Sequence, residues 1–195
     1  MLYSTAFLVL YKHKPKNLYA IFHCRLFSAI IGYGEYGLDI VIKSEFMQNA
    51  LYQAQLAAAE DEVPVGAVVV CDGKIIASAH NKTNAMRDAL YHAEIIALQQ
   101  AAKEIGDWRL NRCVLYVTME PCVMCAGACI NYHLGAIVFG AYDKRMGALC
   151  SSSTITGGML CGKNVPFVGG IMEEECVALL TQYFKNKRNA VTSHE

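Results

Sequence analysis

"LYHAEIIALQQ" (residues 90–100) and "VTMEPCVMCAGA" (residues 117–128) are the two stretches that decide the fold and the chemistry of this chain. In the first, apolar residues recur at helical spacing, so a helix is predicted over 92–105. The second predicts a strand over 113–119 followed by a helix, and Pro121 suits the first turn of that helix because its missing N–H costs nothing there. Both predicted helices begin with side chains that can bind a metal ion or carry a proton.

A histidine and two cysteines form a candidate metal site. Cys122 and Cys125 are three residues apart, so one helical turn brings both sulfurs to one side, and the helix start favours thiolates. With His92 they make three ligands for zinc and leave the fourth tetrahedral position open to water, which distinguishes a catalytic site from a structural one. Glu94 is expected beside the metal, where a carboxylate can take the proton of an activated water and pass it to a substrate.

Each half of this pattern has a plainer reading. A lone C-x-x-C is often structural or redox-active, a lone histidine at a helix start is often a cap, and a zinc module without catalysis is a further alternative. Cys129 could be a fourth ligand, but it lies about 6 Å further along the helix axis than Cys125, so we expect it in the core. The six remaining cysteines have no metal-type spacing and are expected to be buried or in loops: Cys24, Cys71, Cys113, Cys150, Cys161 and Cys176.

The rest of the chain alternates helical and extended patterns, which predicts a three-layer α/β domain. The expected elements are a helix over 44–60 capped by Ser44, strands over 67–71 and 74–79 that turn at Asp72-Gly73, a polar loop over 80–91, a strand over 136–141, a loop over 142–166, a short strand over 167–171 and a final helix over 173–188.

Composition sets limits on the class of protein. Hydrophobic residues make up 54% of the 195 residues and charged residues 17%, which favours a packed core, and the formal net charge of zero gives no general basic field. We expect an N-terminal extension of unknown role over 1–43, a catalytic domain over 44–188 and a tail over 189–195. The extension has neither an apolar run long enough for a membrane span nor the pattern of a secretory signal. The nine cysteines fit a reducing, cytoplasmic location.

The combined pattern H-x-E…P-C-x-x-C resembles the signature of the zinc-dependent cytidine and deoxycytidylate deaminase superfamily. "VPVGAVVV" (63–70), "HN" (80–81), "LYVTMEPCVMCAGA" (115–128) and "VFGAYD" (138–143) are similar to the bacterial tRNA-specific adenosine deaminases in particular. The resemblance covers about 44–188. It implies an αβα fold with a mixed five-stranded sheet.

The same resemblance implies a function and a set of site residues. The family converts adenosine to inosine at the wobble position (34) of a tRNA anticodon, usually that of an arginine tRNA, and works as a homodimer with one Zn²⁺ per subunit. Carried over to this chain, His92, Cys122 and Cys125 hold zinc, Glu94 moves the protons, and the residues that meet the anticodon stem-loop are Asn81, Val65, Asp143, Phe184, Lys185, Lys187 and Arg188. A deaminase of a free base or nucleotide, such as guanine, cytosine or deoxycytidylate, is the alternative.

Three departures from the family pattern concern the substrate more than the chemistry. Met119 replaces a usual leucine, His133 stands where an arginine is common, and residues 149–158 differ from the usual sequence. Phosphate contacts would then be either reduced or supplied by Lys144 and Arg145.

Overall fold

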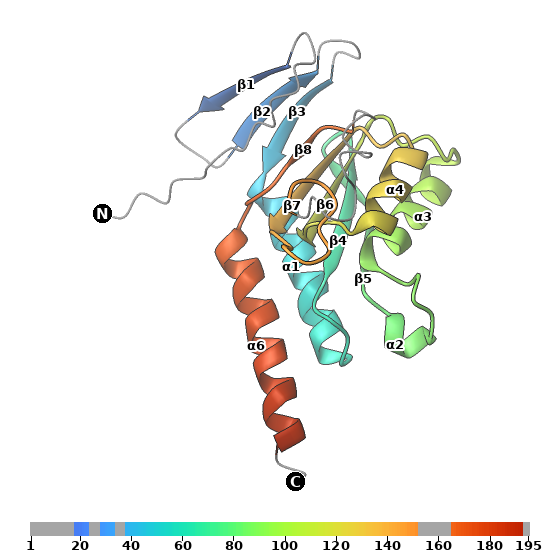
Figure 1. The fold of residues 1–195 in the computed structure, drawn as a ribbon. Helices are drawn as coiled ribbons and strands as arrows, with labels where there is room; N and C mark the ends of the chain where they lie inside the picture. The colour runs from blue at the N-terminus through green and yellow to red at the C-terminus, as the bar shows by residue number, and fades with distance from the viewer. Residues whose placement is uncertain (1–17, 24–27, 34–37, 152–164, 193–195) are drawn as a thin grey trace.

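A mixed five-stranded sheet, in the order β5-β4-β6-β7-β8, forms the middle layer of the fold (Figure 1). The computed structural model describes residues 18–23, 28–33, 38–151 and 165–192. β4 pairs antiparallel with both β5 and β6, whereas β6, β7 and β8 are parallel. The strand bounds are β4 Gly66–Cys71, β5 Lys74–His80, β6 Cys113–Met119, β7 Ala136–Ala141 and β8 Phe167–Val168. The sheet predicted from the sequence is confirmed.

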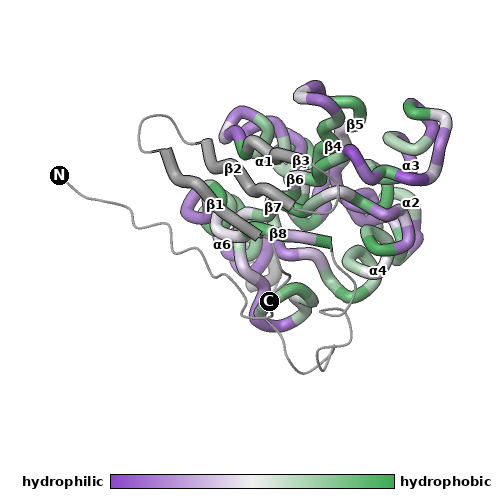
Figure 2. Tube along the Cα trace, turned by 90° about the horizontal axis from the view of Figure 1, so that it is seen from above, coloured by the Kyte–Doolittle hydropathy of each residue, from purple (hydrophilic) through white to green (hydrophobic). Residues whose placement is uncertain are grey.

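Helices cover both faces of this sheet, as Figure 1 shows. The pair α1 (Ser44–Ala59) and α6 (Glu173–Thr192) lies on one face, and the pair α3 (Ala93–Ile105) and α4 (Val123–Asn131) lies on the other. Successive residues of a strand point to opposite faces, so β4 contributes to two cores and is buried on both sides. Figure 2 accordingly colours β4 hydrophobic. The predicted three-layer arrangement is confirmed.

The first helix packs unusually close to the sheet because small residues face each other. A Cβ atom at Gly66 would overlap the backbone carbonyl oxygen of Ala50 and the backbone nitrogen of Ala54. Both alanines are fully buried. Glycine at the start of β4 therefore sets the distance between α1 and the sheet, and with it the position of the chain just before β4.

Three helix boundaries differ from the sequence prediction. α1 has Lys43 rather than Ser44 at its N-cap, because β3 runs directly into the helix and Lys43 keeps an extended backbone. Pro121 precedes the N-cap of α4, which is Cys122, so it lies outside the first turn. α6 continues past Arg188 to Thr192, into the segment that was predicted to be a tail.

The predicted polar loop over 80–91 contains a short helix, α2 (Thr83–Met86). Its third residue, Ala85, donates its backbone N–H to Oε1 of Glu62 at 2.8 Å. A carboxylate from a distant segment thus satisfies a helix N-terminus that the local sequence does not cap.

Three further strands precede α1. They are β1 (Leu18–His23), β2 (Ser28–Tyr33) and β3 (Leu38–Lys43), and they form an antiparallel sheet of their own. The extension predicted over 1–43 thus contains strands, and its division from a catalytic domain stays a prediction. Among the helices of the described residues, none is both long and apolar enough to cross a membrane.

Candidate metal centre and its surroundings

Two helix N-termini bring the three predicted metal ligands together. His92 is the N-cap residue of α3, and Cys122 is the N-cap residue of α4 with Cys125 in the first turn. Nδ1 of His92 lies 3.5 Å from Sγ of Cys125 and 3.9 Å from Sγ of Cys122. The three ligand atoms all lie within 4.8 Å of one another. The structure thus gathers the residues that the sequence predicted as ligands into one cluster.

The spacing of the ligand atoms suits a tetrahedral zinc ion. Ordinary Zn–N and Zn–S bond lengths at tetrahedral angles would separate the nitrogen from each sulfur by about 3.6 Å. The two observed separations bracket that value. Cys129, one turn beyond Cys125, is completely buried in the core between the sheet and α3 and does not belong to the ligand cluster. Within the described residues the cluster therefore offers three ligands, which leaves a coordination position for water.

Hydrogen bonding prepares one of the sulfurs for metal binding. The thiol of Cys125 interacts with Cys122, and this hydrogen bond lowers the pKa of Cys122 to about 4, against the effect of burial. The same bond raises the pKa of Cys125, which keeps its proton. The hydrogen bond with Cys122 also raises the pKa of His92. Cys122 is thus a thiolate before any metal binds, and a cation that enters the cluster displaces the protons of its neighbours.

Glu94 lies beside this cluster as a buried carboxyl group with one oxygen that lacks a hydrogen-bond partner among the described residues. It is the second residue of α3 and only 4% exposed. Its Oε2 atom has no hydrogen-bond partner among the residues that the structure describes. Loss of water around the carboxylate raises the pKa of Glu94 above that of an ordinary glutamate. A buried carboxyl group with an unused oxygen and a raised pKa is suited to accepting and releasing a proton.

Asn81, just after the end of β5, joins the chain before β4 to the start of α3. Its Nδ2 donates to the carbonyl oxygen of Val63 at 3.2 Å, and its Oδ1 accepts from the backbone N–H of Ala93 at 2.9 Å. Its backbone N–H donates to the carbonyl oxygen of Val65, which is 7% exposed. An asparagine side chain has two donors and two lone pairs, so each heteroatom keeps one further position for a substrate. Asn81 is thus linked to Ala93, the residue after His92, and Val65 is linked to Asn81.

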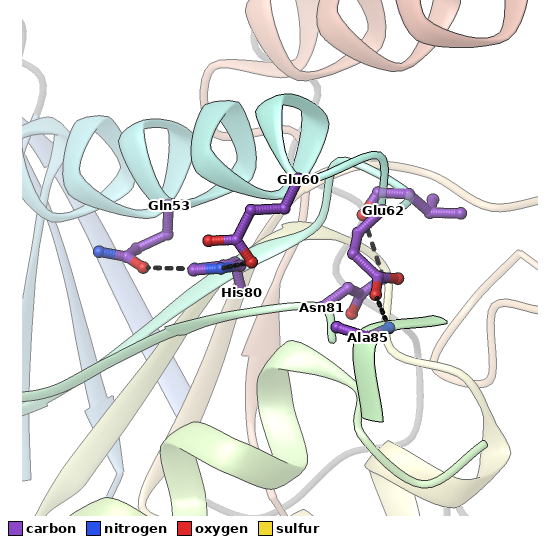
Figure 3. Close-up of polar contacts among 7 residues, drawn as sticks. Gln53, Glu60, Glu62, His80, Asn81 and Ala85 are labelled. Atoms are coloured by element: carbon purple, nitrogen blue, oxygen red, sulfur yellow. Dashed lines mark hydrogen bonds and ion pairs between the residues drawn. The ribbon is translucent and has the colours of Figure 1, made fainter. Parts of the chain in front are cut away.

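The polar residues around Asn81 were missed by the sequence analysis. His80 is buried, with Nδ1 3.1 Å from Oε1 of Gln53 and Nε2 3.2 Å from Oε2 of Glu60, so it ties β5 to α1 (Figure 3). Glu62 is 1% exposed and holds α2 through Ala85. In the sequence, only the pair "HN" (80–81) indicated this network. The partners of His80 come from α1 and its C-terminal end, which the local sequence does not reveal.

Glu120, which directly precedes the "PC" pair, was also missed. It is 3% exposed and accepts hydrogen bonds from four backbone N–H groups of the chain after β7. Burial raises its pKa, but hydrogen bonds from Ser151 and from the backbone outweigh that effect, so the net pKa is lowered. Asp143, one of its partners, is half-buried, and its Oδ1 accepts from the backbone N–H of Arg145 at 2.9 Å.

The predicted RNA contacts on the final helix are not gathered with the metal cluster. α6 packs on the α1 face of the sheet, whereas the metal ligands lie at the starts of α3 and α4 on the other face (Figure 1). Nζ of Lys187 lies 2.6 Å from Oδ2 of Asp61, an ion pair that ties α6 to the turn after α1. Phe184 is 41% exposed, and Lys185 and Arg188 are also exposed. Their contact with RNA stays a prediction.

Comparison with known proteins identifies relatives along most of the chain. The model of the MafB19-like deaminase family matches residues 42–164. The tRNA-specific adenosine deaminase of Bacillus subtilis strain 168 is 38% identical over 143 residues, which are 73% of this chain and 89% of the relative. The tRNA-specific adenosine deaminase of Rickettsia felis is 41% identical over 144 residues, which are 73% of this chain and 100% of the relative.

The solved structures with a similar fold include deaminases of two kinds. A structure from studies of A-to-I editing by tRNA:A34 deaminases at the wobble position of transfer RNA has a TM-score of 0.67 at 37% identity, and the match covers 71% of this chain and 100% of that one. The guanine deaminase of Nitrosomonas europaea has a TM-score of 0.63 at 25% identity, and the match covers 73% of this chain and 84% of that one.

Proposed function

The chain belongs to the tRNA-specific adenosine deaminase family, and from that premise we propose that it hydrolyses adenosine to inosine at position 34, the wobble position, of a tRNA anticodon. The reaction consumes one water and releases one ammonia. The observation that most supports this chemistry is Glu94, a buried carboxyl group with an unpartnered oxygen beside His92, Cys122 and Cys125. A purely structural metal site has no need of such a group.

In the proposed mechanism, His92, Cys122 and Cys125 hold one Zn²⁺ per subunit. The metal, when bound, lowers the pKa of water and so supplies a nucleophile near neutral pH. Glu94 would accept the proton that this water loses and deliver it to N1 of the adenine as the oxygen of the water bonds to C6. Glu94 would then take the second proton, from the new C6 hydroxyl group, and pass it to the amino group, so that the C6–N bond breaks and ammonia leaves. Its burial supports these transfers, because a raised pKa makes the carboxylate of Glu94 a stronger proton acceptor than that of an ordinary glutamate.

Substrate binding in the proposal uses the groups around the metal cluster. Adenine must leave its stack to reach a buried centre, which a single-stranded anticodon loop permits. Asn81 hydrogen-bonds the flipped purine with its two remaining positions, and Val65 lines the base pocket. Asp143 and the α6 residues Phe184, Lys185, Lys187 and Arg188 contact the stem-loop.

Three further parts of the proposal come from the family and not from the geometry. The tRNA is that for arginine, the working form is a homodimer, and the protein acts in the cytoplasm. Because α6 and the metal cluster lie on opposite faces of the sheet, a second copy would help to bring both kinds of contact to one RNA. Sedimentation of the purified protein with and without RNA measures the oligomeric state.

A substrate competition tests the function directly. Purified zinc-loaded protein is incubated with an arginine-tRNA anticodon stem-loop that carries adenosine 34, with the same stem-loop carrying guanosine 34, and with a panel of free guanine, cytosine and deoxycytidylate. We expect inosine from the first RNA and ammonia from none of the others. Ammonia release from the free bases without inosine formation would refute the RNA assignment.

The guanine result has particular weight. The structural similarity to a guanine deaminase shows that this fold can also carry a free-base substrate, so deamination of guanine is the specific second candidate. Its signature would be ammonia and xanthine from guanine at a rate that added stem-loop does not reduce.

A further inference from the structure

The chain that follows β7 lies against the segment that carries the cysteine ligands. The backbone N–H of Ala148 donates to the carbonyl oxygen of Pro121 at 2.9 Å, and Gly147 forms an isolated β-bridge with Cys122. The loop is also closed on itself, since the N–H of Gly147 donates to the carbonyl oxygen of Asp143 at 2.9 Å. We refer to residues 143–151 as the ligand-side loop.

One carboxylate holds both ends of the ligand-side loop. Oε2 of Glu120 accepts from the N–H of Asp143 at 3.2 Å. Its Oε1 accepts from three consecutive N–H groups at the other end, those of Leu149 at 3.0 Å, Cys150 at 2.7 Å and Ser151 at 3.0 Å. Hydrogen bonds to an ionised acceptor are about twice as strong as neutral ones, so these four bonds fix the loop more firmly than an ordinary turn.

The packing leaves no room for another arrangement of this carboxylate. Glu120 is 3% exposed, and a Cβ atom at Gly147 would overlap its carboxyl group. Both oxygens are occupied by backbone donors, so Glu120 is not available to carry protons to a substrate. Its contribution must come through the loop.

The loop presents cationic side chains next to the proposed active site. Lys144 and Arg145 are exposed, and they directly follow Asp143, the residue that Glu120 holds. Lysine and arginine side chains supply most of the affinity for a nucleic-acid backbone. A formal net charge of zero means that such an affinity has to come from local groups in fixed places.

We propose that Glu120 is a positioning residue for the RNA substrate: by holding both ends of the ligand-side loop, it fixes Lys144 and Arg145 beside the metal-ligand segment, where they bind the phosphates of the flipped nucleotide's strand. This inference rests on the proposed function. The proposed role concerns RNA binding and not the bond-breaking steps. Substitution of Glu120 should therefore change KM and have little effect on kcat.

The test compares Glu120→Gln, Glu120→Asp and the control Glu174→Gln, an exposed glutamate in the first turn of α6. Glutamine keeps the shape of the side chain but replaces one acceptor by a donor, so the bond from Asp143 is lost. Aspartate keeps the charge on a shorter stem. We expect Glu120→Gln to raise the KM for the stem-loop about 10-fold, as loss of one charge-assisted hydrogen bond would, with kcat and zinc per chain unchanged. Glu120→Asp should fall between wild type and Glu120→Gln, and Glu174→Gln should match wild type.

A double-mutant cycle separates positioning from general damage to the fold. The double variant Lys144→Ala/Arg145→Ala should raise KM in the wild-type background and have little further effect in Glu120→Gln, because the loop no longer presents those cations. Additive effects, or an unchanged KM in Glu120→Gln, would overturn the proposal. Loss of zinc from Glu120→Gln and Glu120→Asp alike would overturn it too, since the carboxylate would then serve the metal site.

Two measurements test the positioning role of Glu120 independently of the proposed function. Hydrogen exchange at the amide of Asp143 should be faster in Glu120→Gln than in wild type, whatever the substrate. Direct binding of the stem-loop should weaken in the same variant. If wild-type protein forms no inosine, but Glu120→Gln shows faster exchange and weaker RNA binding, the proposed function fails and the positioning role stands. If exchange and RNA binding are equal in Glu120→Gln and wild type, the positioning role alone is refuted.

Discussion

Replacement of Glu94 by glutamine should separate chemistry from metal binding and stability more sharply than any other change. Glutamine has the shape of glutamate but cannot carry a proton. Glu94 lies in the first turn of α3 at 4% exposure, and among the described residues the candidate metal ligands are His92, Cys122 and Cys125. We therefore expect Glu94→Gln to bind one zinc per chain and to bind RNA as the wild type does, while deamination almost stops.

The size of each effect follows from the site. A positioned general acid–base group contributes about 10²–10⁴-fold, and Glu94 would serve two proton transfers, so kcat should fall by at least about 10³-fold. Stability should change in the opposite direction in zinc-depleted protein. A buried carboxylate with one unpartnered oxygen costs more than the corresponding amide by roughly 1–2 kcal/mol. At about 2–4 °C per kcal/mol for a chain of this size, the melting temperature should rise by roughly 2–8 °C.

This stability gain should depend on pH with a definite sign. Because the pKa of Glu94 is raised in the folded state, the unfolded chain loses this proton at a lower pH than the folded chain does. The stability of zinc-depleted wild-type protein should therefore fall as pH rises through the ordinary glutamate range, and Glu94→Gln should remove that part of the fall. The gap between the two melting temperatures should be widest near neutral pH and should close toward pH 4.

The assays are single-turnover inosine formation, zinc per chain by elemental analysis, and thermal unfolding of zinc-depleted samples between pH 4 and pH 8. Glu104→Gln, an exposed glutamate at the far end of the same helix, is the matched control and should change none of the three. Turnover by Glu94→Gln within tenfold of wild type would refute the role of this carboxylate. Loss of zinc in that variant would show that Glu94 is a ligand. A drop in the melting temperature would contradict its description as a buried carboxyl group with an unpartnered oxygen.

The other predictions concern the thiols and the packing of α1. The pKa of about 4 for Cys122 predicts that, in zinc-depleted protein, iodoacetamide alkylates this thiol at a rate that is independent of pH from about 6 to 8 and slows only as pH falls toward 4. Peptide mass spectrometry measures this rate. A rise in the rate centred near pH 8.5 would mean that Cys122 is an ordinary thiol. Cys129→Ala should keep one zinc per chain whereas Cys125→Ala should lose it, and loss of zinc from the first would reveal a closed four-ligand site. Gly66→Ala should destabilise the protein by about 1–3 kcal/mol in urea unfolding because of overlap with α1, while Gly127→Ala, in open space on α4, should stabilise it by up to about 1 kcal/mol; equal effects would mean that α1 can move away from the sheet.

The sequence was sufficient where the determining contacts are local. The ligands Cys122 and Cys125 are one helical turn apart, and His92 and Glu94 share one helix start, so spacing alone predicted which side chains could act together. The hairpin of β4 and β5 was equally readable, because Asp72-Gly73 makes the turn between two apolar strands.

The parts that could not be predicted depend on residues far apart in the chain. The backbone N–H groups that donate to Glu120 lie 23 to 31 residues further along the chain. No local pattern shows that both oxygens of this glutamate will accept hydrogen bonds from the backbone. The ion pair of Lys187 with Asp61 joins residues that are 126 positions apart. Lys187, which was predicted to contact RNA, thus also helps to hold α6 in place. Hydrophobic periodicity also cannot tell which face of a sheet a helix will cover.

This division between local and distant contacts has a consequence for how such a fold changes its substrate. The ligand turn and the carboxylate of Glu94 need only two helix starts, and these can be kept while everything around them varies. Structures as different as a tRNA:A34 deaminase and a guanine deaminase share this fold with the chain. The choice between a base within RNA and a free base must therefore lie in parts held by distant contacts, such as the ligand-side loop under Glu120 and the Asn81 network tied to α1 by His80. Substitutions in those contacts should alter which molecule reaches the metal well before they alter what happens to it there.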